Sequence, residues 1–571
     1  MNKYNIKTLI PYLIITPLII HYFYFLNDSI LLGGEGNYFL KFSNYNYNFI
    51  STWSHWGLGH NQFFLNGVNL LTLIFSFIDN PKINSFVIYS VLYILPFLLF
   101  YHFSKFITKD FFARIISSTF YSFNPFTLSF LNQQNIWNNS IVFLIPLYLI
   151  IIFKFFENIY FLIPILAISF FLLNFIGNPP IFVILIIIID IFIIYKSIDK
   201  EVSYLKTIFI LIFINISYAL ANLHILLPFI FTETSIESFY QSANVQGWLL
   251  STSLNLENLL NIFIGIHHYG NVEFNSFSKY YNYPIIKFVL ISFSFYTFYA
   301  AYKMREKLII KYLVFIYILF FFLTKGVLSP GGFIYSFLFE YIPFFNIFKT
   351  PTEKFAIIIY TIMSIIMLNV FSVKYYNNNF FLKLSIPFVL IIPLYLGFIF
   401  SPHFSVNSEV SRVYPDYKKD LDIIDFIDDN YFNSSILHLP GHYNYQSWKK
   451  NIGNKYSYSG MDPILHNLTN NNFIDLSLNN DLYSSIINKD YNKFYYLSSI
   501  YNLKLIYINN NHFYPFGTIL KPLDVNFFVS DENFEIVYNK NGVEIYEIKN
   551  IKNNHILRSI ESYSKIYVTD F

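Results

Sequence analysis

Two carboxylates stand close behind the first apolar stretch of the chain, where either could do acid–base chemistry. Asp28 follows the apolar residues 8–26, and Glu35 comes seven residues later inside the run GGEG. A carboxylate just beyond a membrane span lies at the membrane surface, where it can take a proton from an acceptor hydroxyl or hold a divalent cation. The alternative is ordinary loop polarity, because no strict ligand spacing is present. Glu35 and Asp28 are therefore candidates for catalysis. The sequence does not decide the cofactor, and a divalent cation is one that these carboxylates would bind.

More polar side chains follow in the same segment, in the run WSHWGLGHNQ at 53–62. We expect three of them, His55, His60 and Gln62, to bind substrate. The two histidines are five residues apart and would not share a helix face, which favours hydrogen-bonding loop residues over zinc ligands. No metal site is predicted from ligand spacing.

The composition shows which solvent surrounds these residues. Of 571 residues, 55% are hydrophobic and 12% are charged, against about 25% charged in soluble domains. The net charge is only +3 and the basic residues are scattered, so nucleic acid is not an expected partner. With no cysteine, the chain has no disulfides and no thiolate nucleophile. Lipid is therefore the main solvent for much of the chain.

The hydropathy pattern predicts about eleven transmembrane helices. Residues 8–26 follow two lysines and lack a small-residue cleavage site, so we expect a retained first span and not a signal peptide. Further stretches of spanning length lie at 84–104, 115–131, 139–155, 159–174, 180–195, 207–230, 286–302, 308–324, 355–373 and 382–400. Residues 1–400 are thus predicted to form a polytopic membrane domain, and 401–571 a separate soluble one.

Basic residues orient the predicted helices. Alternate connections carry them, as expected for cytoplasmic turns: Lys105, Lys109 and Arg114; Lys196, Lys200 and Lys206; Lys303, Arg305, Lys307 and Lys311; Lys374 and Lys383. The N-terminus is then cytoplasmic, in a multi-pass protein of the cell membrane. The long segments 27–83, 231–285 and 325–354 lie outside, where they could roof a cavity, and their short apolar stretches suggest interfacial or re-entrant helices.

The last part of the chain is expected to be an extracytoplasmic domain of mixed α/β or mostly β structure. Strand-like runs occur at 435–439, 504–508 and 535–538, and the last of these should form a hairpin with 543–548. Polar and aromatic residues around Trp448 and His466 would suit carbohydrate, although a packed domain that binds nothing would look similar.

Two acidic residues fall within apolar stretches. Asp190 lies near the predicted cytoplasmic end of its span, which favours a structural role, and Glu340 could face a cavity or the water boundary.

Several short runs resemble one family of membrane enzymes. They are YSFNPF at 121–126, NLHILLP at 222–228, PGG at 330–332 and IPFFNIFKTPTEKF at 342–355. Together with the plan of spans and loops, they resemble the GT-C class of glycosyltransferases, in particular the branch of the mycobacterial arabinofuranosyltransferases and the bacterial proteins that glycosylate teichoic acids. The likeness in spacing covers most of residues 1–400.

The resemblance implies a transferase that moves a sugar from a polyprenyl-phosphate donor to a glycan, lipid or protein acceptor, with membrane lipid around it. Glu35 would be the first choice for the base and Asp28 the second, because the paired acidic residues of some GT-C enzymes are absent. Lys325, Lys349 and Lys354 would bind the donor phosphate, with Lys349 standing where arginine is usual. Each lysine could instead anchor a span to lipid headgroups.

Two other functions remain open. A transporter or flippase of lipid-linked glycans is disfavoured because no inverted repeat and no row of broken helices is predicted. A membrane scaffold that binds glycan without catalysis is the third alternative.

Overall fold

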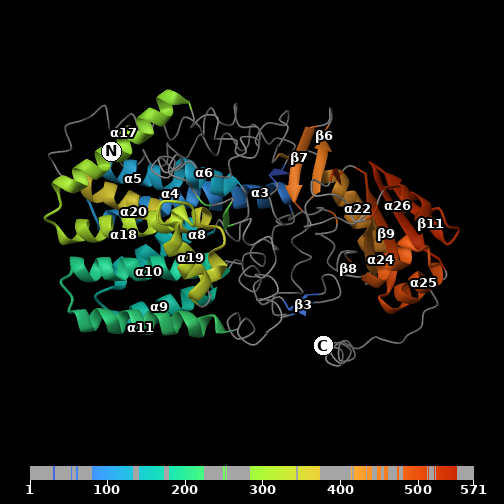
Figure 1. Cartoon of the computed structure of the whole chain (residues 1–571), viewed down its shortest axis with the longest axis horizontal. Coiled ribbons are helices and arrows are strands. Elements are labelled where there is room, and N and C mark those ends of the chain that lie inside the picture. The colour runs from blue at the N-terminus through green and yellow to red at the C-terminus, as the bar shows by residue number, and fades with distance from the viewer. Residues whose placement is uncertain are drawn as a thin grey trace, which may run out of the picture.

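The protein consists of a helical bundle followed by a smaller α/β part (Figure 1). The computed structural model describes residues 30–31, 53–54, 60–61, 80–132, 140–172, 179–223, 249–250, 253, 283–342, 345–372, 413–414, 417–431, 434–439, 447–451, 455–460, 464, 472–474, 480–510, 512–513, 520 and 522–549. The predicted domain boundary near residue 400 lies outside these ranges.

The bundle is built from apolar helices, several of which follow one another through short connections. Their bounds are α3 (Pro81–Tyr89), α4 (Leu95–Phe103), α5 (Phe111–Phe123), α6 (Pro125–Asn132), α8 (Ile141–Phe155), α9 (Ile159–Leu172), α10 (Pro179–Asp199), α11 (Tyr204–Ala221), α17 (Pro284–Lys303), α18 (Leu308–Lys325), α19 (Gly332–Tyr341) and α20 (Pro351–Phe371). A π-helical turn, Ser90–Ile94, joins α3 to α4, and 3-10 turns lie at Ser104–Phe106 and Phe345–Phe348. Within the described ranges, five helices, α10, α11, α17, α18 and α20, are long and apolar enough to cross a membrane.

Nine of the predicted spans fall on described helices, and the first and last lie outside the described residues. One prediction needs correction: the span expected at 115–131 is broken at Asn124, between α5 and α6. The Asn124 side chain replaces the lost helical bonds by donating to the Phe120 and Tyr121 carbonyls and by accepting from the amide of Thr127 at 2.9 Å. Pro125 follows, where the missing N–H is tolerated at the start of a helix.

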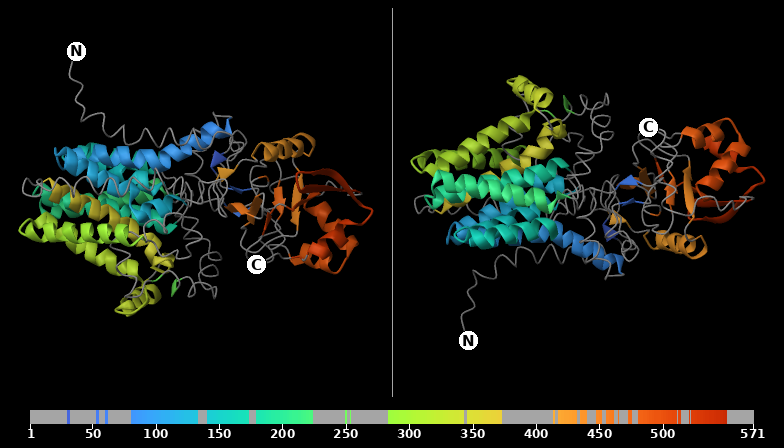
Figure 2. Two further views of the ribbon diagram at one scale, coloured as in Figure 1. Left: turned by 90° about the horizontal axis from the view of Figure 1, so that it is seen from above. Right: turned by 90° about the horizontal axis from the view of Figure 1, so that it is seen from below.

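Helix α20 forms the centre of the bundle. Almost all of its residues are buried, and it packs against α5, α10, α17 and α18. Helix α11 lies at the periphery, packed on α9 and α10, and most of its side chains are uncovered. Figure 2 shows the same bundle from above and below.

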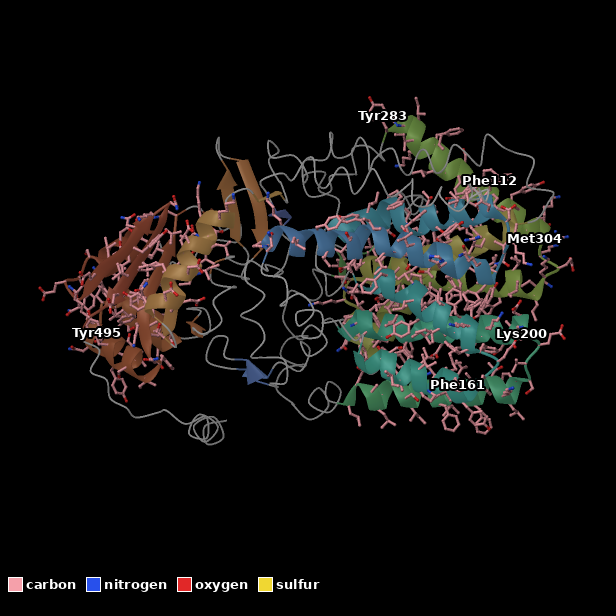
Figure 3. The ribbon with its side chains drawn as sticks, turned by 180° about the vertical axis from the view of Figure 1, so that it is seen from behind. Phe112, Phe161, Lys200, Tyr283, Met304 and Tyr495 are labelled. Atoms are coloured by element: carbon pink, nitrogen blue, oxygen red, sulfur yellow. The ribbon has the colours of Figure 1, made fainter. Side chains whose placement is uncertain are left out.

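The basic turns gather at one end of the bundle. Phe112, at the start of α5, Lys200, between α10 and α11, and Met304, between α17 and α18, all lie at the end far from the C-terminal strands (Figure 3). The prediction that these turns share one side therefore agrees with the arrangement of the helices.

The C-terminal part is a mixed sheet covered on both faces. Its strand order is β11 (Phe534–Lys540), β12 (Val543–Ile548), β9 (Leu503–Asn509), β5 (Ser435–Leu439) and β8 (Asn472–Ile474), with β5 parallel to β8 and β9. Isoleucines of α22 (Tyr417–Asn430) pack on one face, while α24 (Asn480–Ile487), α25 (Tyr491–Ile500) and α26 (Pro522–Val529) pack on the other. A mixed α/β architecture is therefore present.

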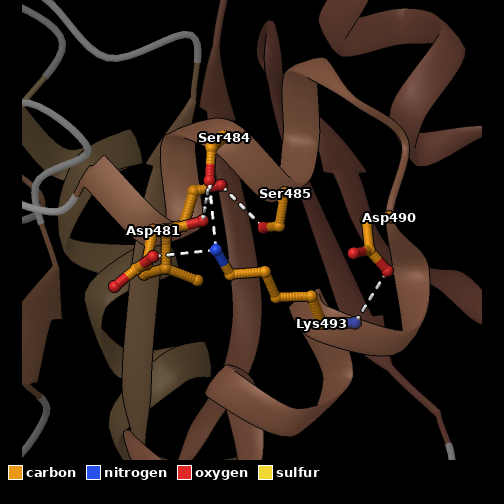
Figure 4. Close-up of polar contacts among 6 residues, drawn as sticks. Asp481, Ser484, Ser485, Asp490 and Lys493 are labelled. Carbon is orange, nitrogen blue, oxygen red and sulfur yellow. Dashed lines mark hydrogen bonds and ion pairs between the residues drawn. The ribbon is translucent and has the colours of Figure 1, made fainter.

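Local chemistry explains two details of this part. The predicted hairpin forms between β11 and β12, and its turn residues Asn541 and Gly542 both have positive φ, as this two-residue turn requires. Helices α24 and α25 are joined by Lys493, whose Nζ lies 2.8 Å from Asp481 Oδ1, while Asp490 caps α25 through the Lys493 amide (Figure 4).

Short strand pairs lie between the two parts. The first, β1 (Ile30–Leu31) and β4 (Val413–Tyr414), is antiparallel, as is β2 (Trp53–Ser54) with β3 (His60–Asn61). A three-stranded sheet contains β10 (His512–Phe513), β6 (Ser447–Asn451) and β7 (Lys455–Gly460). Trp448 lies in β6 opposite Phe513, whereas His466 is outside the described residues.

Candidate functional site

The residues predicted to carry catalysis fall outside the described ranges. Asp28, Glu35, His55 and Gln62 are not described, and His60 is described only as a backbone position of β3. Strand β1 nevertheless lies between Asp28 and Glu35 in sequence, and it is in contact with α3 and paired with β4. The chain next to both carboxylates therefore lies at the end of the bundle that faces the C-terminal part.

At the same end, α18 meets the start of α20. We call this region, residues 324–328 and 349–354, the α18–α20 junction. The Thr352 hydroxyl donates to the Thr324 carbonyl at 3.2 Å, and Gly326 has a φ of 77°. A Cβ added to Gly326 would lie 2.7 Å from Pro351 Cγ and still closer to Ser253 Oγ, so only glycine fits here. This close approach brings Lys325 beside the first turn of α20.

Lys325 is a buried lysine that has no ion-pair partner among the described residues. Only 3% of the residue is exposed, its Nζ donates to the Leu328 carbonyl, and it lies 6.0 Å from the centre of the Phe322 ring. No carboxylate of the described ranges forms an ion pair with it. A buried charge normally has a counter-ion, and the described part of the chain supplies none to Lys325.

The other two lysines belong to the α20 side of the junction. Lys354 Nζ lies 3.2 Å from Glu353 Oε2, which also accepts from the Thr350 hydroxyl at 3.0 Å. The side chains of this ion pair are 6% and 10% exposed. Burial lowers the pKa of Lys349, and the nearby Lys354 lowers it further, whereas Glu353 raises it.

The junction is electropositive as a whole. Three lysines and one glutamate leave two net positive charges, and the positive end of the α20 dipole adds to them. Such a site would attract a phosphate, through point charges and not through the bidentate geometry of arginine.

Helix α19 forms one wall of the junction. Its Tyr335 is fully buried and donates to the Phe348 carbonyl at 2.6 Å, and its ring packs against Phe345 and Phe355. On the opposite side Phe333, Phe337 and Tyr341 are exposed. A short helix with an uncovered aromatic edge fits the predicted interfacial helix. Glu340 is exposed on α19, which is compatible with a position at the water boundary.

Sequence reasoning missed two polar side chains that form hydrogen bonds within the α18–α20 junction. Thr350 and Ser253 were not singled out, yet Thr350 binds Glu353, and Ser253 Oγ accepts from the Val327 amide at 3.0 Å. A signal existed for Thr350, because threonine followed by proline before an apolar run marks the start of a helix. Ser253 lies 74 residues from Val327 in sequence, and no local pattern marks it.

Asp190 needs a correction. Helix α10 continues beyond the predicted end of its span, because Lys196 forms an ion pair with Asp199 at 2.6 Å and lies over the ring of Phe153. Asp190 is therefore near the middle of the helix and not near its end.

In the described part of the chain, no group of three His, Cys, Asp or Glu side chains is arranged to hold a metal ion. A scan against protein-family models and a search of curated proteins return no match to this chain. The assignment of the α18–α20 junction thus depends on its own geometry and charge.

Proposed function

We propose that this protein is a GT-C-type glycosyltransferase with about eleven spans, which transfers a sugar from a polyprenyl-phosphate donor to a glycan, lipid or protein acceptor on the outer face of the cell membrane. The observation that supports this most is Lys325, a buried cation whose partners in the described chain are a carbonyl and an aromatic ring. A lipid phosphate would supply the missing negative charge.

The location of the junction agrees with such a substrate. The basic turns mark the opposite end of the bundle as cytoplasmic by the positive-inside rule, so the junction would lie at the outer surface. The exposed aromatic edge of α19 beside it would sit at the level of the headgroups. A donor with a lipid tail and a phosphate head meets both an apolar surface and a cationic one.

The reaction assigns one role to each set of residues. Glu35 takes the proton of the acceptor hydroxyl as that oxygen forms a bond to the anomeric carbon of the sugar. The bond between the anomeric carbon and the phosphate oxygen breaks, and the electron pair leaves with the lipid phosphate. Lys325 and Lys349 stabilise the charge that develops on this leaving group.

The test is radiolabelled sugar transfer from a panel of polyprenyl-phosphate donors by membranes containing matched amounts of each variant. Glu35→Gln should lower transfer by about 10²- to 10⁴-fold, the range for loss of a general base. Glu340→Gln is the matched control, because it removes an exposed carboxylate of α19 and should leave transfer unchanged. Equal transfer by Glu35→Gln and wild type would remove Glu35 from the mechanism, and no transfer by the wild type would remove the transferase function.

The break between α5 and α6 favours the transporter alternative, because broken helices often form solute sites. However, the side chains of Asn124 and Thr127 form hydrogen bonds with one another and with the Phe120 and Tyr121 carbonyls. Movement of a lipid-linked glycan across the membrane of vesicles that contain the protein, with no transfer of the sugar, would support this alternative over the transferase.

A further inference from the structure

One carboxylate lies halfway along a membrane helix. Helix α10 has 21 residues, a length of about 31 Å, which matches the roughly 30 Å hydrocarbon core of a bilayer. Asp190 is near its midpoint. Among the described membrane helices, the other acidic residues lie in the first or last turn or in connections.

The contacts of Asp190 leave its charge uncompensated. Asn215 of α11 donates through Nδ2 to both carboxylate oxygens, at 3.0 and 3.1 Å. On the other side, the Tyr312 hydroxyl of α18 donates to the neighbouring Ile191 carbonyl at 2.9 Å. No basic side chain of the described chain forms an ion pair with Asp190.

Asp190 also belongs to a face that is only partly covered. The half-buried residues of α10 recur with helical spacing: Val183, Ile187, Asp190, Ile194 and Ile198. Helices α11 and α18 both pack on α10, and Asn215 is itself exposed, on the same side of α11 as the exposed Ile212, three residues earlier. A charged group and an amide are therefore presented at mid-membrane depth, where lipid offers no hydrogen bond.

We propose that this face of α10 and α11 binds a transmembrane helix of a different membrane protein, which brings a lysine or arginine to Asp190. The partner's chemistry follows from charge complementarity, because a carboxylate in hydrocarbon is stabilised by a cation or by several donors. A second copy does not supply that cation. The lysines of the predicted spans, Lys154, Lys287, Lys311 and Lys383, stand within four residues of a span end, and no arginine falls within a span.

Site-specific photocrosslinking in native membranes tests this. A photoreactive residue at position 212 should give an adduct with another polypeptide, whereas one at Phe288 or Phe295, exposed residues of α17, should not. The cross-linked peptide should come from a span with lysine or arginine in its middle third. Asp190→Asn keeps the side-chain shape and should lower the adduct at least tenfold at equal protein level.

Charge exchange provides a second readout. Asp190→Lys should lose the adduct, and changing the partner's basic residue to glutamate should restore it. Adducts with lipid alone or with a second copy, a partner without a mid-span cation, or an adduct unaffected by Asp190→Asn would each overturn the proposal. If Asp190→Asn does not accumulate, the identity of the span cross-linked to the wild type decides.

Discussion

The two ends of the helical bundle differ in how their cations are compensated. At the end with the basic turns, Lys200 and Arg305 have 43% and 54% exposed side chains, and the buried Lys196 is paired with Asp199 at 2.6 Å. At the α18–α20 junction, Lys325 is 3% exposed and the Glu353–Lys354 pair is almost covered. Withdrawing an ion from water costs several kcal/mol, so a buried lysine at either end needs a specific partner. Lys196 has such a partner in Asp199, whereas no carboxylate among the described residues forms an ion pair with Lys325.

The largest effect should come from breaking the buried ion pair. Glu353→Gln leaves Lys354 buried without its counter-ion and should lower the free energy of unfolding by about 3–5 kcal/mol, measured by denaturant titration in detergent. The double variant Glu353→Gln/Lys354→Met removes both charges and should recover most of the loss. Additive losses in the double variant would show that the two groups do not interact.

Next in size is the loss of the Lys325 cation, which forms no ion pair with a described residue. Lys325→Met should lower sugar transfer by about 100-fold, or roughly 2.7 kcal/mol, because one charged contact to the leaving phosphate is lost. Its unfolding temperature should not fall, since a buried charge that forms no ion pair with a described residue is replaced by an apolar side chain of similar length. Lys105→Met, at the end with the basic turns, is the control and should change neither quantity. Parallel loss of stability and transfer in Lys325→Met would reduce Lys325 to a structural residue.

A smaller effect concerns pH. Because burial and Lys354 lower the pKa of Lys349, it loses its proton at a lower pH than an exposed lysine. A phosphate binds the protonated form, so the donor KM should rise as the pH increases through this pKa, by up to about tenfold per pH unit. Lys349→Arg stays charged and should flatten this alkaline rise. An equally steep rise in the arginine variant would assign the titration to another group.

The smallest effect is expected for an exposed ion pair. Lys200 contacts Glu157 across the turns of the basic end, and both side chains are largely in water. Glu157→Gln should leave the unfolding temperature unchanged within error, at low and at high salt. A clear loss of stability would mean that the two ends of the bundle do not differ as argued.

Hydropathy alone predicted most of the bundle, because a helix surrounded by lipid must be apolar along its length. It did not predict where α10 ends or that α5 stops at Asn124, because an ion pair and a side-chain cap decide these points. The hairpin of β11 and β12 was predictable since its turn chemistry is local.

The residue types of the site could be predicted from the sequence, but the burial and the contacts of these residues could not. The lysines of the junction could be named from the sequence, but their burial results from contacts between distant segments, such as Thr352 with Thr324 and Gly326 with Ser253. Glu35 stays a prediction, since it lies outside the described residues.

The pairing of β1 with β4 has a consequence for the order of assembly during synthesis. Ile30 faces Tyr414 and Leu31 faces Val413, so the two strands are separated by roughly 380 residues of chain. At the usual ribosomal pace of about 5–20 residues per second, the first strand waits roughly 20–80 seconds for its partner. During this interval every intervening helix is synthesised. Strand β1, which lies between Asp28 and Glu35 in sequence, therefore acquires its partner only after the helices of the bundle have left the ribosome, so the contact next to the proposed catalytic residues is among the last to form.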